Sequence, residues 1–140
     1  MHDYNLLYRE EEREMLPLCA DQGVGVIPWS PLARGTLARA GSASSDTARS
    51  GSDGRIDYLY DPDNDRLVLE RVAEVARDRE LPAAQVALAW LLRQPGVTAP
   101  IVGATKDRHV DDAVAAVSVD LSEKELAFLA EPYRPREVRF

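Results

Sequence analysis

The clearest hydrophobic pattern is a run that is apolar nearly all round, Val86–Leu92, shortly after Pro82. A helix without a polar face is buried on most sides, and proline is common in a first helical turn. Apolar residues at helical spacing predict a helix over Arg66–Arg79 and another around Val110–Val117. Three acids followed by apolar residues predict a helix over Glu10–Gln22. The pattern therefore predicts a helix-rich chain.

Two short apolar runs, Val24–Trp29 and Thr98–Val102, interrupt the helical pattern. Their β-branched content and lack of alternation are typical of parallel strands buried on both faces. The first run follows a helix that ends at Gly23, a natural left-handed cap, and this order is half of a β-α-β unit. Two such strands would have open edges. The pattern thus predicts an incomplete α/β unit whose neighbouring strands are encoded elsewhere.

The two ends of the chain are less regular. Tyr4–Tyr8 is short and mixed, and fits either the tail of a strand or a loop. Ser122 and Glu125 have the spacing of a capping box, which predicts a last helix. The tail Pro132–Phe140 is expected to be extended and bound to the surface.

Residues 36–65 lack periodicity, and their middle is rich in Gly, Ser and Ala. Long loops of this kind inside compact domains are usually functional lids or disordered, so a mobile lid is expected. The spaced acids of Asp61–Asp65 resemble a calcium loop, which needs Gly at its sixth position and Glu at its twelfth. Arg66 and Val72 stand there, so a helix-capping turn is favoured and no metal site is predicted.

Composition narrows the possible partners. The chain has 140 residues, which suits one domain, and a net charge of -7, which argues against nucleic acid or an anionic membrane as main partner. Cys19 is the only cysteine, so a reducing compartment fits. No apolar run approaches the ~20 residues that span a bilayer, and the first residues lack a signal pattern. A cytoplasmic protein is expected.

Candidate chemistry lies after each predicted strand, at Trp29–Leu37 and at Ile101–His109. Ligands of parallel α/β folds bind at the carboxyl ends of strands, where a serine hydroxyl and backbone N–H groups can hold a pyrophosphate. An aromatic ring there can stack on a flat cofactor. The alternatives are an ordinary turn with Trp29 as a core residue, and a plain connection between strand and helix.

Several segments in this order resemble the aldo-keto reductase family. They are Tyr4–Leu7, Trp29–Gly35, Thr47–Arg49, Gln85–Leu92, Pro100–Lys106 and Glu131–Pro135. The resemblance covers nearly the whole chain, and it is greatest to bacterial relatives of the voltage-gated potassium channel β subunit. It implies that residues 1–140 form the C-terminal portion of a (β/α)8 TIM barrel, with about two to three parallel strands. It also implies NADP(H) as cofactor and reduction of an aldehyde or ketone to an alcohol.

The resemblance also implies a role for individual residues. Trp29 would stack on the nicotinamide, and a pyrophosphate loop would consist of Ser30, Pro31, Leu32, Ala33 and Gly35. The loop 36–65 would cover the cofactor with Arg39 and Arg49. The adenosine and 2′-phosphate side would consist of Gly103, Thr105, His109 and Asp112. The sequence departs from the family at Met1 and His109, where many relatives have Gln, and at Ala113, where many have Asn.

The family's catalytic Asp, Tyr, Lys and His lie in a preceding half, and nothing in this sequence matches them. Its lysines, Lys106 and Lys124, and its 5 tyrosines lie in other segments. We therefore expect a cofactor-binding part that is inactive by itself, with a small carbonyl compound as substrate of the full-length protein. The alternatives are a non-catalytic nucleotide-binding or interaction module, which would pair with an N-terminal half or another copy of itself, and a product that never folds stably.

Overall fold

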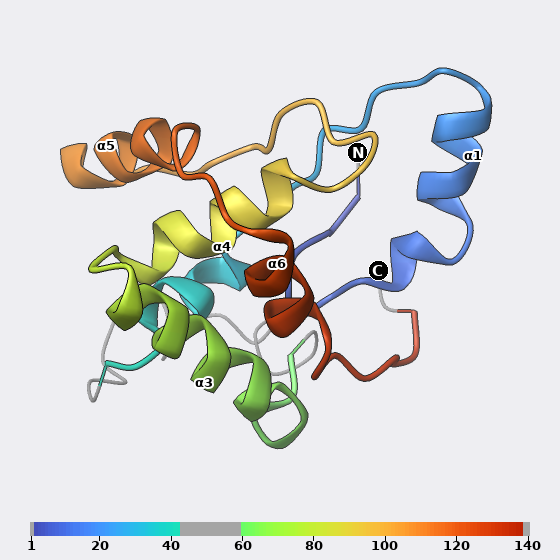
Figure 1. Cartoon of the computed structure of the whole chain (residues 1–140). Coiled ribbons are helices and arrows are strands. Elements are labelled where there is room, and N and C mark those ends of the chain that lie inside the picture. Colours follow the sequence, from blue (N-terminus) through green and yellow to red (C-terminus); the bar gives the residue numbers. More distant parts are fainter. Residues whose placement is uncertain (1, 43–59, 139–140) are drawn as a thin grey trace.

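A computed structural model describes residues 2–42 and 60–138 (Figure 1). The described chain is helix-rich, and its extended segments pair only through isolated bridges. In chain order the helical elements are η1 (Glu10–Glu12), α1 (Met15–Asp21), η2 (Ala33–Gly35), η3 (Leu37–Arg39), α3 (Pro62–Asp78), α4 (Ala83–Leu92), α5 (Asp107–Ala116) and α6 (Glu123–Ala130), where η marks a 3-10 helix.

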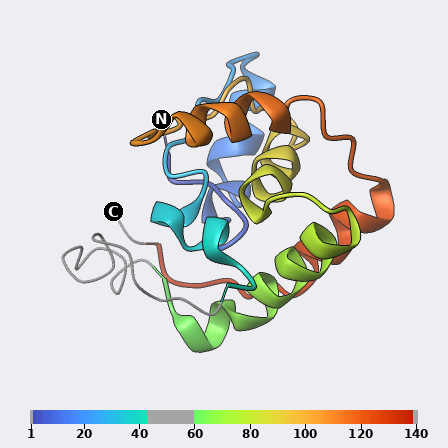
Figure 2. The same cartoon turned by 90° about the vertical axis from the view of Figure 1, so that its left-hand side faces the viewer.

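Helix α4 is the centre of the core, as its apolar run predicted. It lies between α5 on one side and the neighbouring helices α3 and α6 on the other (Figures 1 and 2). Eight of its ten residues, Ala83, Ala84, Val86, Ala87, Leu88, Ala89, Trp90 and Leu91, are buried. Trp90 is the largest, with its ring 6.0 Å from that of Tyr4 and 5.3 Å from the guanidinium carbon of Arg9. The contacts of Trp90 with Tyr4 and Arg9 therefore join the N-terminal residues to the later helices.

Two predicted helix starts are confirmed in their capping contacts. The carboxylate of Asp61 accepts hydrogen bonds from the backbone N–H groups of Asp63 and Asn64, so the acidic turn caps α3. Ser122 and Glu125 form the complete capping box of α6. Arg79 also reaches from beyond the end of α3 to Glu125, 2.6 Å away. That arginine, together with Ser122, lowers the pKa of Glu125 to about 2.

The predicted helix Glu10–Gln22 is wrong as a continuous element. It divides into η1 and α1, and the residue before α1, Glu14, has φ -137. Pro17 explains the break, because a proline inside a helix lacks the N–H for the i−4 bond and collides with that carbonyl. Starting α1 at Met15 leaves Pro17 in the first turn, where its N–H is not needed.

The two predicted strands come together in parallel but form no regular ladder within the described residues. Val26 pairs with Val97 and Trp29 with Asp3, each as a single parallel bridge. The hydrogen bond from Ile101 N to Pro28 O, 2.8 Å, continues the first pairing. Prolines explain the gaps, because Pro28 and Pro100 cannot donate to a ladder. Three neighbouring parallel segments result, which agrees with a partial barrel.

Burial of these segments on both faces needs neighbouring strands encoded elsewhere and stays a prediction. Val26 is 5% exposed, but Val24 is 54%, Ile27 48% and Ile101 44% exposed. Val26 is therefore buried and Val97 packs against the core, while the β-branched side chains of Val24, Ile27 and Ile101 face solvent. Apolar residues on an open parallel layer are the pattern of a surface that packs against further elements.

The tail begins with a turn at Pro132 and has no helix or strand from Tyr133 to Val138, and its contacts reach buried groups. Tyr133 Oη and Arg136 N both donate to Glu10 Oε1, at 2.6 and 2.8 Å. Burial of Glu10 opposes its ionisation, yet these hydrogen bonds lower its pKa. The Arg136 guanidinium pairs with Asp65, and the two side chains are only 10% and 4% exposed. The tail thus fastens the start of α3 to the N-terminal segment.

Within the predicted loop 36–65, the structure describes residues 36–42 and 60–65. They include η3 and the start of α3, so the loop is partly helical at both ends. Arg49 lies outside the described residues, and the covering role of the loop stays a prediction. Among the helices of 2–42 and 60–138, none combines the length and apolarity needed to cross a bilayer.

The buried pair Asp65–Arg136 yields a test of stability. Arg136→Ala is expected to lower the free energy of unfolding by about 3 to 5 kcal/mol, because it leaves a buried carboxylate without its cation. The matched control is Arg66→Ala, which removes the exposed partner of Glu70 at 3.2 Å and should cost less than about 1 kcal/mol. Urea unfolding measures both variants. Equal losses would contradict a stabilising role of the tail.

Candidate functional site

The first candidate segment begins where the parallel pairing ends. Trp29 N donates to His2 O at 2.9 Å, and the half-buried indole packs against the core. The chain then adopts an unusual backbone, with positive φ at Ser30 (55), Ala33 (48), Arg34 (53) and Gly35 (94). Three of these are not glycine, and such residues in left-handed conformations concentrate at functional sites. This strained loop is the structural reason to look for a ligand here.

The backbone N–H groups of this loop mostly donate hydrogen bonds within the loop itself. Ala33 N bonds to Ser30 O, Arg34 N to Ser30 Oγ, and Gly35 N to Leu32 O, at 2.9 to 3.2 Å. An anion held here would therefore meet the Ser30 hydroxyl and the nearby arginines before it met these N–H groups. Of the predicted residues Pro31 and Ala33 are buried, while Ser30, Leu32, Gly35 and Arg39 are half-buried. Arg34, within the same turn, was not among the predicted site residues.

The second candidate segment is more exposed. Gly103 and Thr105 face solvent, and half-buried His109 places Nδ1 3.3 Å from Thr105 N. Asp112 accepts a hydrogen bond from Gln85 Nε2 at 2.8 Å, which joins α5 to α4. The N-cap of α5, Lys106, makes no side-chain capping bond, so the start of this helix keeps donors that suit an anion.

The two candidate segments lie at the same ends of neighbouring parallel segments. The Ile101–Pro28 hydrogen bond places the chain before Gly103 beside the chain before Trp29. This arrangement is the one that a dinucleotide needs if its two halves are to reach both loops. The structure describes eleven of the twelve predicted residues, all except Arg49, and the two segments that carry them begin next to each other at this edge. Their role in binding stays a prediction.

A buried polar cluster next to the first loop was missed by sequence reasoning. Asp3, Asn5 and Tyr60 are 5%, 0% and 4% exposed. Asn5 Nδ2 contacts Asp3 Oδ1 and Ser30 O at 3.0 Å and Tyr60 Oη at 3.2 Å, while Tyr60 Oη donates to Asp3 Oδ2 at 3.2 Å. Burial raises the pKa of Asp3 to about 7, against the hydrogen bond from Tyr60 and the charge of Arg34.

Three tyrosines, Tyr4, Tyr60 and Tyr133, are unsuited to donate a catalytic proton. Burial, followed by neighbouring carboxylates, raises the pKa of Tyr4 beside Glu12 and of Tyr60 beside Asp3. Burial and Glu10 do the same for Tyr133. A general acid works best when its pKa is shifted toward the working pH, which is the opposite direction. Lys106 and Lys124 are exposed, and neither forms a hydrogen bond or ion pair with these tyrosines among the described contacts.

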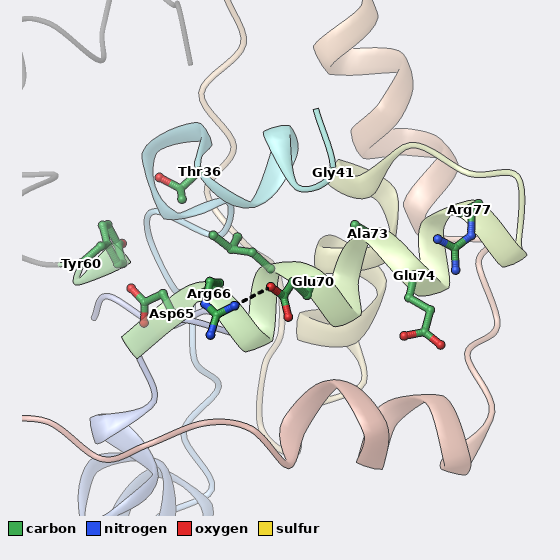
Figure 3. Close-up of a pocket in the computed structure, with 10 residues that line it drawn as sticks. Thr36, Gly41, Tyr60, Asp65, Arg66, Glu70, Ala73, Glu74 and Arg77 are labelled. Atoms are coloured by element: carbon green, nitrogen blue, oxygen red, sulfur yellow. Dashed lines mark hydrogen bonds and ion pairs between the residues drawn. The ribbon is translucent and has the colours of Figure 1, made fainter. Parts of the chain in front are cut away.

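A separate hollow of about 510 Å³ lies between α3 and the chain after η2 (Figure 3). Its α3 wall carries both charges, with Arg66 and Glu70 paired at 3.2 Å. None of the predicted site residues lines it. Gly41 and Tyr60, on its rim, flank the undescribed segment, so the described walls alone do not define a ligand site. His, Cys, Asp and Glu side chains form no metal-binding cluster in the described ranges.

The helices and the neighbouring parallel segments agree with part of an α/β barrel. A sequence model of the Aldo/keto reductase family matches residues 2–133, so the chain belongs to the Aldo/keto reductase family. A similar curated protein is a versiconal hemiacetal acetate reductase of Aspergillus parasiticus, 48% identical over 139 residues, covering 96% of this chain and 40% of that protein. An aldo-keto reductase of Fusarium vanettenii is 47% identical over 138 residues, covering 97% and 36%.

A solved structure with the same fold is a thermostable aldo-keto reductase in complex with the inhibitor epalrestat. It matches with a TM-score of 0.64 and 26% sequence identity, covering 93% of this chain and 38% of that one. The chain therefore spans 36 to 40% of the length of these relatives. The family and the barrel relationship agree with the resemblance seen in the sequence.

The buried Asp3 carboxyl predicts how stability depends on pH. Its pKa is raised from 3.8 to about 7 by folding, so the folded state holds a proton that the unfolded state releases. The free energy of unfolding should fall as pH rises from about 4 to about 7, by at most about 4 kcal/mol, and then level off. Urea unfolding between pH 4.5 and 8 measures this slope.

Asp3→Asn should remove most of that slope, because the amide does not titrate. Asp63→Asn, at an exposed position in the first turn of α3, is the matched control and should keep the slope. The assignment fails if the Asp3 variant loses stability with pH as steeply as the unchanged chain.

Proposed function

We propose that this chain is the cofactor-binding C-terminal part of an NADP(H)-dependent reductase that converts aldehydes or ketones to alcohols. The observation that supports it most is the strained loop Trp29–Gly35 beside the Gly103–Asp112 segment, in a chain of the Aldo/keto reductase family. A relative whose name is that of a reductase, at 48% identity, supports carbonyl reduction. A cytoplasmic location is part of the proposal and rests on the single cysteine.

Different residues hold different parts of the cofactor. Trp29 stacks on the nicotinamide, the loop from Ser30 to Gly35 holds the diphosphate, and Arg39 and Arg49 lie over it. Thr105 and His109, with the start of α5, hold the adenosine side. When bound, the cofactor supplies the hydride of the reaction. The proton that must reach the carbonyl oxygen has no donor among the tyrosines discussed above, so these 140 residues are expected to bind without turning over.

A second candidate function is a non-catalytic nucleotide-binding or interaction module. The exposed side chains of Val24, Ile27 and Ile101 favour it, because they leave apolar surface on the parallel segments. An N-terminal half of the family barrel or another copy of the chain would cover that surface. Light scattering with and without NADP(H) separates a chain that associates through this surface from one that only binds the cofactor. A compact monomer that ignores NADP(H) would refute both binding proposals.

Titration of the purified chain with NADPH, followed by addition of an aromatic aldehyde, tests the proposed function directly. Saturable enhancement of nicotinamide fluorescence is expected, with no oxidation of NADPH above the rate without protein. Absence of binding would refute the cofactor assignment. Turnover would refute the claim that these residues are inactive by themselves.

Gly35→Ala is a sharper test of the loop. At φ 94 any side chain is strained, and the added Cβ would also lie 2.9 Å from an Arg39 guanidinium nitrogen, so that side chain must move as well. A cost of about 1 to 2 kcal/mol should weaken NADPH binding by about tenfold. Gly23→Ala, also at positive φ (65) but in open space at the end of α1, is the control and should bind normally. Equal affinity of all three proteins would contradict a diphosphate role for the loop.

A further inference from the structure

Four polar groups form a connected chain from the interior to the proposed diphosphate loop. Asp3 and Asn5 lie on the first segment, Tyr60 precedes α3, and Ser30 begins the strained loop. Tyr60 Oη is 3.2 Å from Asp3 Oδ2, 3.2 Å from Asn5 Nδ2 and 3.5 Å from Ser30 Oγ. The phenol oxygen of Tyr60 is therefore the junction between a buried carboxyl and the serine hydroxyl.

Hydrogen-bond capacity allows this chain two complete arrangements. Asn5 Nδ2 donates to Asp3 Oδ1, so a proton on Asp3 belongs on Oδ2, facing Tyr60. With Asp3 protonated, Tyr60 accepts from Asp3 and Asn5 and donates to Ser30 Oγ. With Asp3 ionised, Tyr60 donates to Asp3 and accepts from Asn5 and from Ser30. Each group keeps a partner in both arrangements, which a hydroxyl with one donor and two lone pairs permits.

The two arrangements differ in what Ser30 offers to a ligand. Ser30 Oγ already accepts from Arg34 N at 3.2 Å. When Tyr60 also donates to it, both lone pairs are occupied and the hydroxyl proton is directed outward, where an anion can accept it. When Tyr60 accepts from it, that proton is turned inward.

We propose that Tyr60 is a positioning residue for cofactor binding, which transmits the protonation of Asp3 to the hydroxyl of Ser30. The inference rests on the proposed function, in which Ser30 holds the diphosphate of NADP(H). Protonated Asp3 favours the bound cofactor, and binding in turn favours the proton, because linkage is reciprocal. Tyr60 itself touches neither cofactor nor substrate.

The charged groups around Asp3 influence the pH at which its carboxyl loses the proton. Arg34, in η2, favours the ionised carboxyl, and Glu11, in η1, opposes it. Glu11 itself lies 3.3 Å from His2 Nδ1. Burial dominates these influences and brings the pKa of Asp3 to about 7, within the range in which both arrangements are populated.

The test is the dissociation constant of NADPH, measured by fluorescence titration of the 140-residue chain at pH 6 and pH 8. The unchanged chain should bind about three- to tenfold more weakly at pH 8, the range expected from one hydrogen bond of about 0.5 to 1.5 kcal/mol. Asp3→Asn has an amide that donates to Tyr60 at every pH. It should bind at pH 8 about as tightly as it does at pH 6, apart from the change due to the cofactor's own phosphate.

Tyr60→Phe should bind weakly at both pH values, because the connection to Ser30 is removed. Tyr4→Phe is the matched control, since it removes a hydroxyl that is equally buried but bonds to Glu12 at 2.7 Å. It should keep the pH profile of the unchanged chain. Circular dichroism verifies that each variant is folded, and the Asp3 variant still decides the question if the Tyr60 variant does not fold.

The possible failures are distinct. An unchanged chain that does not bind NADPH at either pH overturns the proposed function, and the role of Tyr60 falls with it. Binding by the unchanged chain with the same pH profile in Asp3→Asn overturns the positioning role alone and leaves the cofactor assignment standing.

Discussion

Burial of a single amide, the side chain of Asn5, is the constraint on which the site depends. The residue is 0% exposed, so each of its polar atoms needs a partner inside the protein. Its Oδ1 accepts from Leu7 N at 2.9 Å and Tyr8 N at 3.1 Å, which holds the turn after the first parallel segment. Its two Nδ2 hydrogens are shared among Asp3, Ser30 and Tyr60. One side chain thus joins the first segment, the strained loop and the approach to α3.

The helices were largely predictable because their causes are local. The apolar run of α4, the capping box of α6 and the acidic cap of α3 are each encoded within a few residues, and all three form as expected. The same local rules failed at Glu10–Gln22 because apolar spacing was weighed without Pro17. They failed at the strands because Pro28 and Pro100 interrupt the ladder, while burial on both faces depends on neighbours outside the segment and stays a prediction.

The candidate site was predictable only where it is continuous in sequence. Both loops follow apolar runs, and their family motifs mark them directly. Asp3, Asn5 and Tyr60 carry no such signal, since Tyr60 contacts Asp3 across 57 positions and Asn5 across 55. Nothing periodic or compositional connects them. The sequence offers one clue, which is a polar residue between two largely apolar ones. Asn5 lies between Tyr4 and Leu6, and both neighbours are buried in the structure.

The contacts of the tail also affect the order in which parts of the protein fold. Glu10 accepts its hydrogen bond from Arg136 N across 126 positions. Contacts of such long range slow folding, because the intervening chain must be ordered before they form. During synthesis Arg136 follows Glu10 by 126 positions, so this hydrogen bond is among the last of the described contacts that can form. Helix α4 and the segment that contains Tyr4 and Arg9 are complete before the tail is, so the core can pack before the tail is attached.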